Sequence, residues 1–329
     1  MISRLVDKML KGDRRALSRL FSLLERDAES LSAVMRAVYP HRGGAYCIGI
    51  TGPPGAGKST IVDGLVKILR QQGKAVGVLA VDPTSPFSGG AVLGDRIRMQ
   101  RHFLDEGVFI RSMATRGVSG GVSRGARASV KLMDTYGMDM IIVETVGVGQ
   151  TELDITKVAD TVVVTLVPEG GDAVQAMKAG LMEIGDIFVV NKADRVGAGR
   201  LVAIIKAMVG IGGGESWWRP PILTTQAHKG EGIQALYDGV LQHRQAMETT
   251  SNLERRRSQR QAQEFAQTLK EAVEAGIAGL ISQEDGPLSA IAAQVRKGEL
   301  DPYSAAERLL EDDLFFSQLA RALGDSRGR

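Results

Sequence analysis

Nine consecutive residues have the types and spacing of a phosphate-binding loop. They follow the pattern Gly-x4-Gly-Lys-Ser/Thr. In such a loop the glycines let backbone N–H groups curl around phosphate oxygens, the lysine reaches the terminal phosphates, and the serine binds a magnesium ion. The segment therefore predicts a nucleoside triphosphate with Mg²⁺ as the ligand, bound by Gly52, Pro53, Pro54, Gly55, Ala56, Gly57, Lys58, Ser59 and Thr60.

The loop lies between two stretches with the patterns of regular structure. Residues 45–50 (Ala-Tyr-Cys-Ile-Gly-Ile) form the apolar run of a buried strand, and residues 58–70 carry apolar side chains at helical spacing. A helix that begins at Lys58 would direct its partial positive charge at the phosphates. Strand, loop and helix thus follow in the order that a phosphate loop requires, which disfavours a glycine-rich turn that binds nothing.

A second motif selects the base of the nucleotide. Asn191, Lys192, Ala193 and Asp194 follow the apolar residues 187–190, at the carboxyl end of a predicted strand, where ligands bind in open parallel sheets. The carboxylate of Asp194 can accept hydrogen bonds from the ring N–H and the exocyclic amine of guanine, whereas adenine has no matching pair of donors. Asn191 and the stem of Lys192 would brace the loop and the ring. The motif therefore predicts a guanine nucleotide.

Residues 225–230 are expected to complete the base site. They read Thr-Gln-Ala-His-Lys-Gly and follow a short candidate strand at residues 222–224. We expect the backbone N–H of Ala227 to hold the base oxygen. Gln226 stands where guanine-nucleotide proteins usually have a serine, and we expect His228 to be a solvent-facing loop residue beside the nucleotide.

Three carboxylates are placed to reach the metal or the attacking water. Glu144 follows the apolar residues 140–143 and opens a Glu-x-x-Gly motif, where most GTP-binding proteins have Asp-x-x-Gly. Asp82 ends the strand predicted at residues 76–81, and Asp95 precedes the helix predicted near residues 96–104, which it could also cap. Since Mg²⁺ prefers hard oxygen ligands, we expect Ser59, Asp82, Asp95 and Glu144 to bind it.

The residues that follow Glu144 bear on hydrolysis. Gly147 would offer its N–H to the γ-phosphate, so residues 146–151, which include Gln150, are expected to form a loop that senses hydrolysis. Val148 occupies the position at which many such enzymes carry a glutamine that orients water. Intrinsic hydrolysis should therefore be slow or use another group.

The rest of the chain predicts an α/β fold with helical additions. Alternating strand and helix patterns indicate a central, mostly parallel sheet of a P-loop NTPase, with a G domain at residues 42–248. Residues 1–41 form an N-terminal helical region, and residues 249–329 form a C-terminal helical arm suited to dimerisation. Further strands are predicted at 108–110 and 161–167. Further helices are predicted near 125–136, 174–183, 196–209, 232–245, 253–281 and 315–323, with another capped by Asp301.

The composition excludes several classes of function. Of 329 residues, 24% are charged and 43% hydrophobic, and no apolar run is long enough to cross a bilayer. Charged side chains interrupt residues 1–11, so we expect no secretory signal and a cytoplasmic location. The net charge of +3 does not indicate nucleic acid binding, and the basic run at residues 255–260 is expected to be a solvated helix face. Cys47, the only cysteine, is expected to be a buried strand residue.

The motifs together resemble one known family. The phosphate loop, Val-Asp-Pro-Thr-Ser (81–85), Gly-Asp-Arg-Ile-Arg-Met (94–99), Glu-Thr-Val-Gly-Val-Gly-Gln-Thr-Glu (144–152) and Asn-Lys-Ala-Asp (191–194) closely resemble those of the MeaB/ArgK family, the methylmalonyl-CoA mutase-associated GTPases of the SIMIBI class. The resemblance runs from the N-terminal helices to the C-terminal arm. It implies a homodimeric GTPase that chaperones the adenosylcobalamin-dependent mutase, gates its cofactor loading and protects it from inactivation. The composition, as stated above, predicts no nucleic acid or membrane partner.

The resemblance also implies roles for particular residues. Asp82, Asp95 and Glu144 match the metal and switch carboxylates of the family. Residues 169–178 match an additional switch that relays the nucleotide state to the mutase, and within it Asp172 and Lys178 are the candidate switch residues. Attack of water on the γ-phosphate would then use Lys58 and Mg²⁺ to neutralise charge and Asp82 to position the water, with the mutase completing the switch loops.

Three alternatives remain open at this point. A metal-inserting GTPase is one, although four histidines and one cysteine are few for that role. A kinase for a small molecule or a transport protein is another, although no separate acceptor site and base are evident. The third is a nucleotide-binding module without turnover, since the water-orienting glutamine is missing.

Overall fold

The computed structural model describes residues 1–41, 43–82, 99–114, 124–145, 149–168, 180–211, 217–282 and 288–325. Contacts divide the chain into two units, residues 1–256 and residues 257–329. The first unit contains the sheet and its covering helices, and the described residues of the second unit form helices and their connections. The domain limits expected from the sequence stay a prediction.

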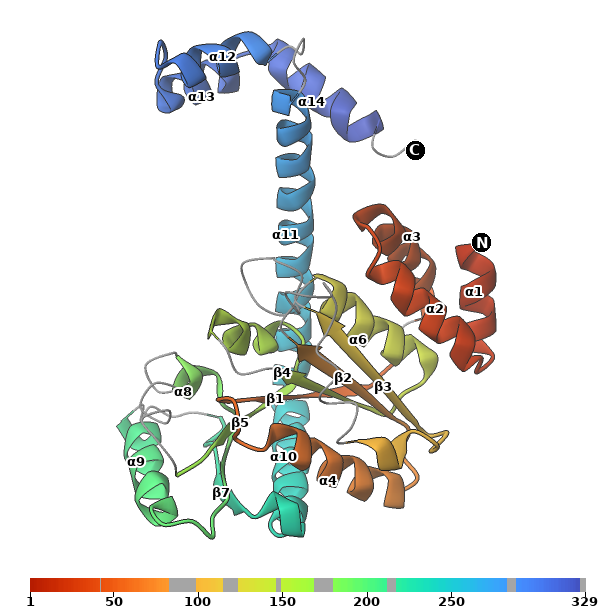
Figure 1. Ribbon diagram of the computed structural model, residues 1–329, viewed down its shortest axis with the longest axis vertical. Coiled ribbons are helices and arrows are strands. Elements are labelled where there is room, and N and C mark those ends of the chain that lie inside the picture. The colour runs from red at the N-terminus through yellow and green to blue at the C-terminus, as the bar shows by residue number, and fades with distance from the viewer. Residues whose placement is uncertain are drawn as a thin grey trace. The chain divides into compact units, whose positions relative to one another are not determined.

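A seven-stranded sheet forms the centre of the first unit (Figure 1). Every pair of neighbouring strands in it is parallel, and the order is β3-β2-β4-β1-β5-β6-β7. The central strands are buried along their whole length, as their unbroken apolar sequences predict. This confirms the predicted α/β class, and the strands are β1 (Tyr46–Thr51), β2 (Val76–Asp82), β3 (Val108–Ala114), β4 (Met140–Thr145), β5 (Thr161–Leu166), β6 (Ile187–Asn191) and β7 (Ile222–Thr225).

Helices cover both faces of the sheet (Figure 1). On one face, α4 (Lys58–Gln71) and α10 (Ile233–Thr249) pack on the apolar residues of the central strands. The other face is covered by α6 (Arg124–Tyr136), η3 (Gly149–Lys157), α8 (Leu181–Ile184) and α9 (Ala198–Ile211). Cys47 is buried on this second face, as predicted. Of the helix predicted near residues 96–104, the described part is the short η2 (Gln100–His102).

Three N-terminal helices pack beside the edge strand β3. They are α1 (Ile2–Leu10), α2 (Arg14–Leu24) and α3 (Ala28–Val38), followed by η1 (Tyr39–His41). Phe21 stacks on Phe109 of β3 with the ring centroids 5.3 Å apart. Arg14 donates to the carbonyl oxygens of Glu106 (2.9 Å) and Val108 (2.6 Å), so the helices are fixed by polar as well as apolar contacts.

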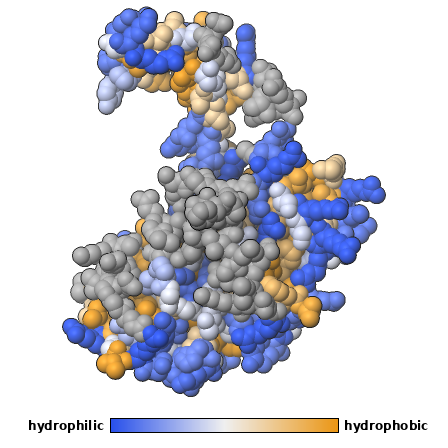
Figure 2. Space-filling view, in the orientation of Figure 1, coloured by the Kyte–Doolittle hydropathy of each residue, from blue (hydrophilic) through white to orange (hydrophobic). Residues whose placement is uncertain are grey.

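The second unit has a small apolar core of its own. Its helices are the main part of α11 (Asn252–Ser282), α12 (Ser289–Lys297), α13 (Pro302–Leu310) and α14 (Asp313–Asp325). Leu280, Leu288, Phe315 and Leu319 form the core. Asp301 accepts hydrogen bonds from the backbone of Tyr303 and Ser304, which confirms the predicted cap. Figure 2 shows hydrophobic residues at the surface of this unit. Among the residues of α11, Phe265 and Leu269 are 71% and 54% exposed.

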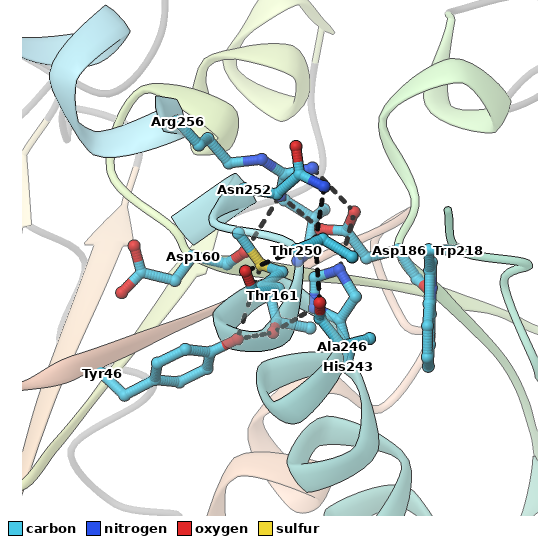
Figure 3. Close-up of polar contacts among 12 residues, drawn as sticks. Tyr46, Asp160, Thr161, Asp186, Trp218, His243, Ala246, Thr250, Asn252 and Arg256 are labelled. Carbon is cyan, nitrogen blue, oxygen red and sulfur yellow. Dashed lines mark hydrogen bonds and ion pairs between the residues drawn. The ribbon is translucent and has the colours of Figure 1, made fainter. Parts of the chain in front are cut away.

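A buried polar network lies at the amino ends of β1, β5 and β6, the edge opposite the phosphate loop (Figure 3). Thr161 Oγ1 lies 2.7 Å from the Tyr46 hydroxyl and 2.8 Å from Nδ1 of His243. Asp186 lies 3.4 Å from Nε2 of His243 and accepts two hydrogen bonds from Arg256, at 3.0 and 3.1 Å. Because Thr161 and His243 are both fully buried, this Thr-His-Asp row has no access to a substrate.

The network corrects one expectation from the sequence. The basic run at residues 255–260 was predicted to be a solvated helix face, and for Arg256 this is wrong. Its guanidinium binds the Asp186 carboxylate and also donates to the carbonyl oxygen of Asp160 at 2.9 Å. Arg256 thereby fixes the first turns of α11 to the sheet.

No described helix has both the length and the apolar character that a membrane span requires.

Candidate nucleotide site

The phosphate loop connects the end of β1 to the start of α4. Gly52, Gly55 and Gly57 all have positive φ (136°, 75° and 86°), a backbone conformation that favours glycine. A Cβ atom at Gly52 would lie 2.0 Å from the carbonyl oxygen of Thr165, and one at Gly57 would lie 2.3 Å from Nδ2 of Asn191. Two of the three glycines are therefore required by close approach as well as by conformation.

Lys58 holds its ammonium group over this loop. Its Nζ donates to the carbonyl oxygens of Gly52 at 2.8 Å and Pro53 at 3.0 Å, and the residue is 6% exposed. These two contacts keep the cation at the mouth of the loop. A phosphate oxygen is a stronger partner for an ammonium group than a carbonyl oxygen, so this lysine is poised to exchange one for the other.

Ser59 and Glu144 meet where β1 and β4 end side by side. The hydroxyl of Ser59 donates to Oε1 of Glu144 at 2.7 Å, and both residues are buried. Directly behind them, Thr145 donates to Thr51 at 2.9 Å. A serine hydroxyl and a carboxylate are the hard oxygen ligands that Mg²⁺ takes, so this pair fits that ion.

The described residues supply few other metal ligands at this point. They include no group of three or more His, Cys, Asp or Glu side chains that could hold a metal ion.

Asn191, the last residue of β6, joins the phosphate loop to the base loop. Its Nδ2 donates to the carbonyl oxygen of Ala56 at 2.8 Å. Its Oδ1 accepts from Thr225 Oγ1 at 2.9 Å and from the backbone N–H of Ala227 at 3.1 Å. The amide therefore braces both loops, and it is 3% exposed.

The turn after Asn191 exposes the carboxylate of Asp194 on the side where a ligand could bind. Lys192 adopts a left-handed conformation with φ of 55°, and the N–H of Ala193 donates to the carbonyl oxygen of Thr225 at 3.0 Å. Asp194 is exposed beyond this turn. The turn thus fixes the backbone and presents the Asp194 side chain outward.

The base loop differs in detail from the expectation. The N–H of Ala227, expected to hold the base oxygen, donates to Asn191 in this structure. Gln226 is engaged by the ammonium group of Lys229 at 2.8 Å, and His228 is exposed, as predicted for a loop histidine. Contacts of Gln226, Ala227 and His228 with a base stay a prediction.

For several predicted site residues the structure describes no side chain. Asp95, Gly147, Asp172 and Lys178 lie outside the described residues, as does Val148. Asp82 is the last residue of β2 and Gln150 lies in η3, and for both only the backbone is described. The structure thus brings together Lys58, Ser59, Glu144, Asn191 and Ala227 with the loop glycines.

The sequence patterns did not predict the contacts of two residues near the site. Thr225 was read only as the start of the base loop, yet its hydroxyl fixes Asn191. Asp63 of α4 is 5% exposed and lies one helical turn after Ser59. In the sequence, Asp63 is a carboxylate within a helical stretch of mainly apolar residues. A carboxylate at such a position is expected to have a buried polar or charged partner.

These features define a class of protein. A glycine-rich phosphate loop leads from the central strand into a helix, a carboxylate from the neighbouring strand contacts its serine, and an Asn-Lys-x-Asp turn follows a strand on the other side. Together they are the arrangement of a P-loop GTPase.

Comparison with known proteins identifies the family within this class. The family model described as "Methylmalonyl Co-A mutase-associated GTPase MeaB" matches residues 16–280. A protein of Pyrococcus abyssi is 49% identical over 318 residues, which cover 95% of this chain and 97% of that protein. GTPase ArgK of Escherichia coli is 33% identical over 282 residues, which cover 82% of this chain and 83% of ArgK.

A solved structure agrees with these relatives. The crystal structure of a LAO/AO transport system kinase superposes with a TM-score of 0.70 at 26% identity, and the match covers 94% of this chain and 96% of that one. The chain therefore belongs to the MeaB/ArgK family of GTPases, as the sequence motifs indicated, and it binds and hydrolyses GTP.

Proposed function

We propose that this GTPase is a chaperone of adenosylcobalamin-dependent methylmalonyl-CoA mutase, which gates cofactor loading and protects the mutase from inactivation. The family description names association with that mutase, and the family match extends from α2 into α11. The structural observation that carries the proposal is the contact between Ser59 and Glu144. It connects the phosphate loop to Glu144 of β4, the first residue of the Glu-x-x-Gly motif. In the proposal, this contact transmits nucleotide occupancy to the switch residues that follow Glu144 in the sequence.

The proposed reaction is in-line attack of water on the γ-phosphate, which breaks the bond to the β-phosphate and gives GDP and phosphate. Lys58 binds the terminal phosphates, and Ser59 and Glu144 hold Mg²⁺, with Asp82 and Asp95 as further candidates. The bound ion supplies neutralisation of charge on the phosphate oxygens. Asp82 positions the water and Gly147 donates its N–H to the γ-phosphate. Because Val148 cannot orient water, hydrolysis is slow until the mutase completes the site.

Base selection is assigned to the turn after β6. Asp194 accepts hydrogen bonds from guanine, and Lys192 lies beside the ring. The support is the rigid turn held by Asn191 and Thr225, which presents Asp194 to solvent at the carboxyl edge of the sheet. The relay to the mutase is assigned to Gln150, Asp172 and Lys178.

The second unit is the proposed site of homodimer formation. Its core buries one face of α11, whereas Phe265 and Leu269 lie four residues apart on the exposed helix. Residues at this spacing share one helix face, so the pair forms an apolar stripe that a second copy of the chain would cover.

The test of the chaperone role uses purified mutase, immobilised without its cofactor. Binding of the GTPase is measured with GDP and with a non-hydrolysable GTP analogue, and phosphate release is measured with and without mutase. We expect binding to depend on the nucleotide and hydrolysis to rise at least about tenfold with mutase. Equal hydrolysis with and without mutase would contradict partner-assisted catalysis, and the absence of any binding would contradict the chaperone role.

The same assay addresses the alternatives. The structural relative is titled a transport system kinase, which describes that protein. A kinase would transfer the γ-phosphate to an acceptor, so labelled phosphate would appear on a protein or small molecule rather than free in solution. A metal-inserting role is not favoured, because the sequence has only four histidines and one cysteine.

A further inference from the structure

Two buried threonines lie side by side where the central strands β1 and β4 end. Oγ1 of Thr145 donates to Oγ1 of Thr51 at 2.9 Å, and the two residues are 1% and 0% exposed. Thr51 is the last residue of β1, directly before Gly52 of the phosphate loop, and Thr145 is the last residue of β4, directly after Glu144. The hydrogen bond therefore joins the residue before the phosphate loop to the strand that carries Glu144.

This hydrogen bond stands where the backbone pairing between the two strands stops. The last registered pair of β1 and β4 is Ile50 with Glu144. One residue further on, Thr51 is paired with β5 and Thr145 is paired with β2. Each strand is thus still held by its outer neighbour, while the contact between the two strands passes from the backbone to the threonine side chains.

The end of β4 contacts both ends of the phosphate loop, from the two faces of the sheet. Consecutive residues of a strand point to opposite faces, so Glu144 and Thr145 project to opposite sides. Glu144 accepts a hydrogen bond from Ser59, the second residue of α4, and Thr145 donates to Thr51. Thr51 comes before the loop glycines and Ser59 comes after them, so the two contacts bracket the loop.

Stability alone does not require two hydroxyl groups at this point. Replacing both partners of a buried hydrogen bond with apolar groups of the same shape can be almost neutral, and valine has nearly the shape of threonine. What the hydrogen bond adds is direction, because it weakens steeply when its donor and acceptor are misaligned. The threonine pair therefore fixes how far the end of β4 lies along β1.

The alignment of these strand ends sets the geometry between Ser59 and Glu144. Oγ of Ser59 lies 2.7 Å from Oε1 of Glu144. Mg²⁺ requires near-octahedral geometry with its oxygen ligands at about 2.1 Å, so a displacement on the order of 0.5 Å at the end of β4 would disturb this pair as a ligand set.

From these relationships we propose that Thr51 and Thr145 are positioning residues for the magnesium site formed by Ser59 and Glu144. They act through the ends of the strands rather than by contact with the ion. Their hydrogen bond keeps the carboxylate of Glu144 in register with the phosphate loop. The inference rests on the proposed assignment of Ser59 and Glu144 to Mg²⁺.

The test removes the hydrogen bond while keeping the shape of the core. In the double variant Thr51→Val and Thr145→Val both hydroxyl groups are replaced together, so neither is left buried without the other. Thr145→Ser, which keeps the hydroxyl, is the conservative rescue. Thr161→Val is the matched control, because Thr161 is an equally buried threonine whose hydroxyl is hydrogen-bonded at the opposite edge of the same sheet.

The measurements separate magnesium binding from folding. One is the Mg²⁺ concentration that half-maximally slows release of a fluorescent GDP analogue, and another is the Mg²⁺ dependence of GTP hydrolysis. The affinity for the same GDP analogue in EDTA reports the phosphate loop without the ion, and the melting temperature reports the fold.

We expect the double variant to raise the half-maximal Mg²⁺ concentration roughly tenfold in both assays, because a small misplacement of a ligand weakens a site strongly. Its GDP affinity in EDTA should stay within about twofold, and its melting temperature should stay close to that of the wild type. Thr145→Ser should keep most of the wild-type Mg²⁺ dependence. Thr161→Val should leave that dependence within about twofold even where it lowers the melting temperature.

Two results would overturn the inference. One is a wild-type Mg²⁺ dependence in the double variant, or in Thr145→Val alone if the double variant does not fold. The other is an equal shift in Thr161→Val, since the effect would then reflect general loosening of the sheet. A wild-type protein whose nucleotide release and hydrolysis do not depend on Mg²⁺ would instead overturn the magnesium assignment itself, and the positioning role would fall with it.

Discussion

The side-chain amide of Asn191 contacts the carbonyl oxygen of Ala56 at 2.8 Å, across 135 residues of sequence. The opposite end of the same amide accepts hydrogen bonds from Thr225 and Ala227. One buried side chain thus fixes the loop for the phosphates relative to the loop for the base. Their separation, which must match the length of a nucleotide, depends on this residue.

Asn191→Ala should weaken nucleotide binding and destabilise the fold together. The change leaves the hydroxyl of Thr225 and the N–H of Ala227 buried without their acceptor, which costs at least about 2 kcal/mol in the free energy of unfolding. We expect the dissociation constants of GDP and GTP to rise more than about tenfold. Titration with a fluorescent GDP and chemical denaturation measure the two effects. Lys229→Ala, an exposed change in the same loop, is the control, and an affinity loss of similar size there would contradict the bracing role.

Asp194→Asn should change the base that the protein prefers. The amide offers a donor where the carboxylate offered an acceptor, which suits the carbonyl oxygen of xanthine in place of the amine of guanine. We expect GDP affinity to fall and XDP affinity to rise, so that their ratio changes by roughly 100-fold or more. Competition of GDP and XDP for the wild type and the variant measures this ratio. Unchanged GDP affinity would show that Asp194 does not contact the base.

Lys58→Met should remove catalysis while keeping the shape of the loop. The apolar side chain matches the length of the lysine stem but cannot neutralise charge on the terminal phosphates. We expect the rate of GTP hydrolysis to fall at least about 100-fold, with a smaller loss in GDP affinity. Single-turnover phosphate release and GDP titration measure the two quantities. A variant that hydrolyses GTP within a few-fold of the wild type would remove Lys58 from the mechanism.

Sequence patterns predicted the elements of this fold better than the contacts between them. The strands carry unbroken apolar runs and the phosphate loop has fixed residue types, so local sequence was sufficient for both. The helix α12 was missed because it spans nine residues and has no side-chain cap. Partners distant in sequence were also missed: a composition argument placed Arg256 in solvent, whereas it binds Asp186, 70 residues away. Only the folded sheet brings such residues together.

Acid should destabilise the protein through His243. Burial lowers the pKa of this imidazole from 6.5 to about 4, with the Asp186 carboxylate opposing that shift and Arg256 reinforcing it. The folded state therefore stays unprotonated where the unfolded state takes up a proton, so stability is lost as pH falls from 6.5 towards 4. The loss is up to about 3 kcal/mol.

Urea denaturation at pH values from 7 to 4 measures the free energy of unfolding across the interval between the two pKa values of His243, 6.5 and about 4. His243→Asn should flatten this part of the pH profile, because the amide retains a polar group near Thr161 but does not titrate. His228→Asn, a change at an exposed loop histidine, serves as the control. A wild-type pH slope in His243→Asn would assign the acid sensitivity to other groups.

The exposed stripe on α11 gives a prediction about assembly. If Phe265 and Leu269 contact a second copy of the chain, the double change Phe265→Glu and Leu269→Lys should convert a dimer to a monomer, because burying either charge against an apolar face is unfavourable. Neither residue belongs to the apolar core of the second unit, so its fold should persist. Light scattering after size exclusion gives the mass, and circular dichroism reports the helices.

Gln267→Glu, a change on the same helix outside the stripe, is the control. A double variant that stays dimeric would place the interface elsewhere, and a wild type that is monomeric at tens of micromolar would contradict the homodimer.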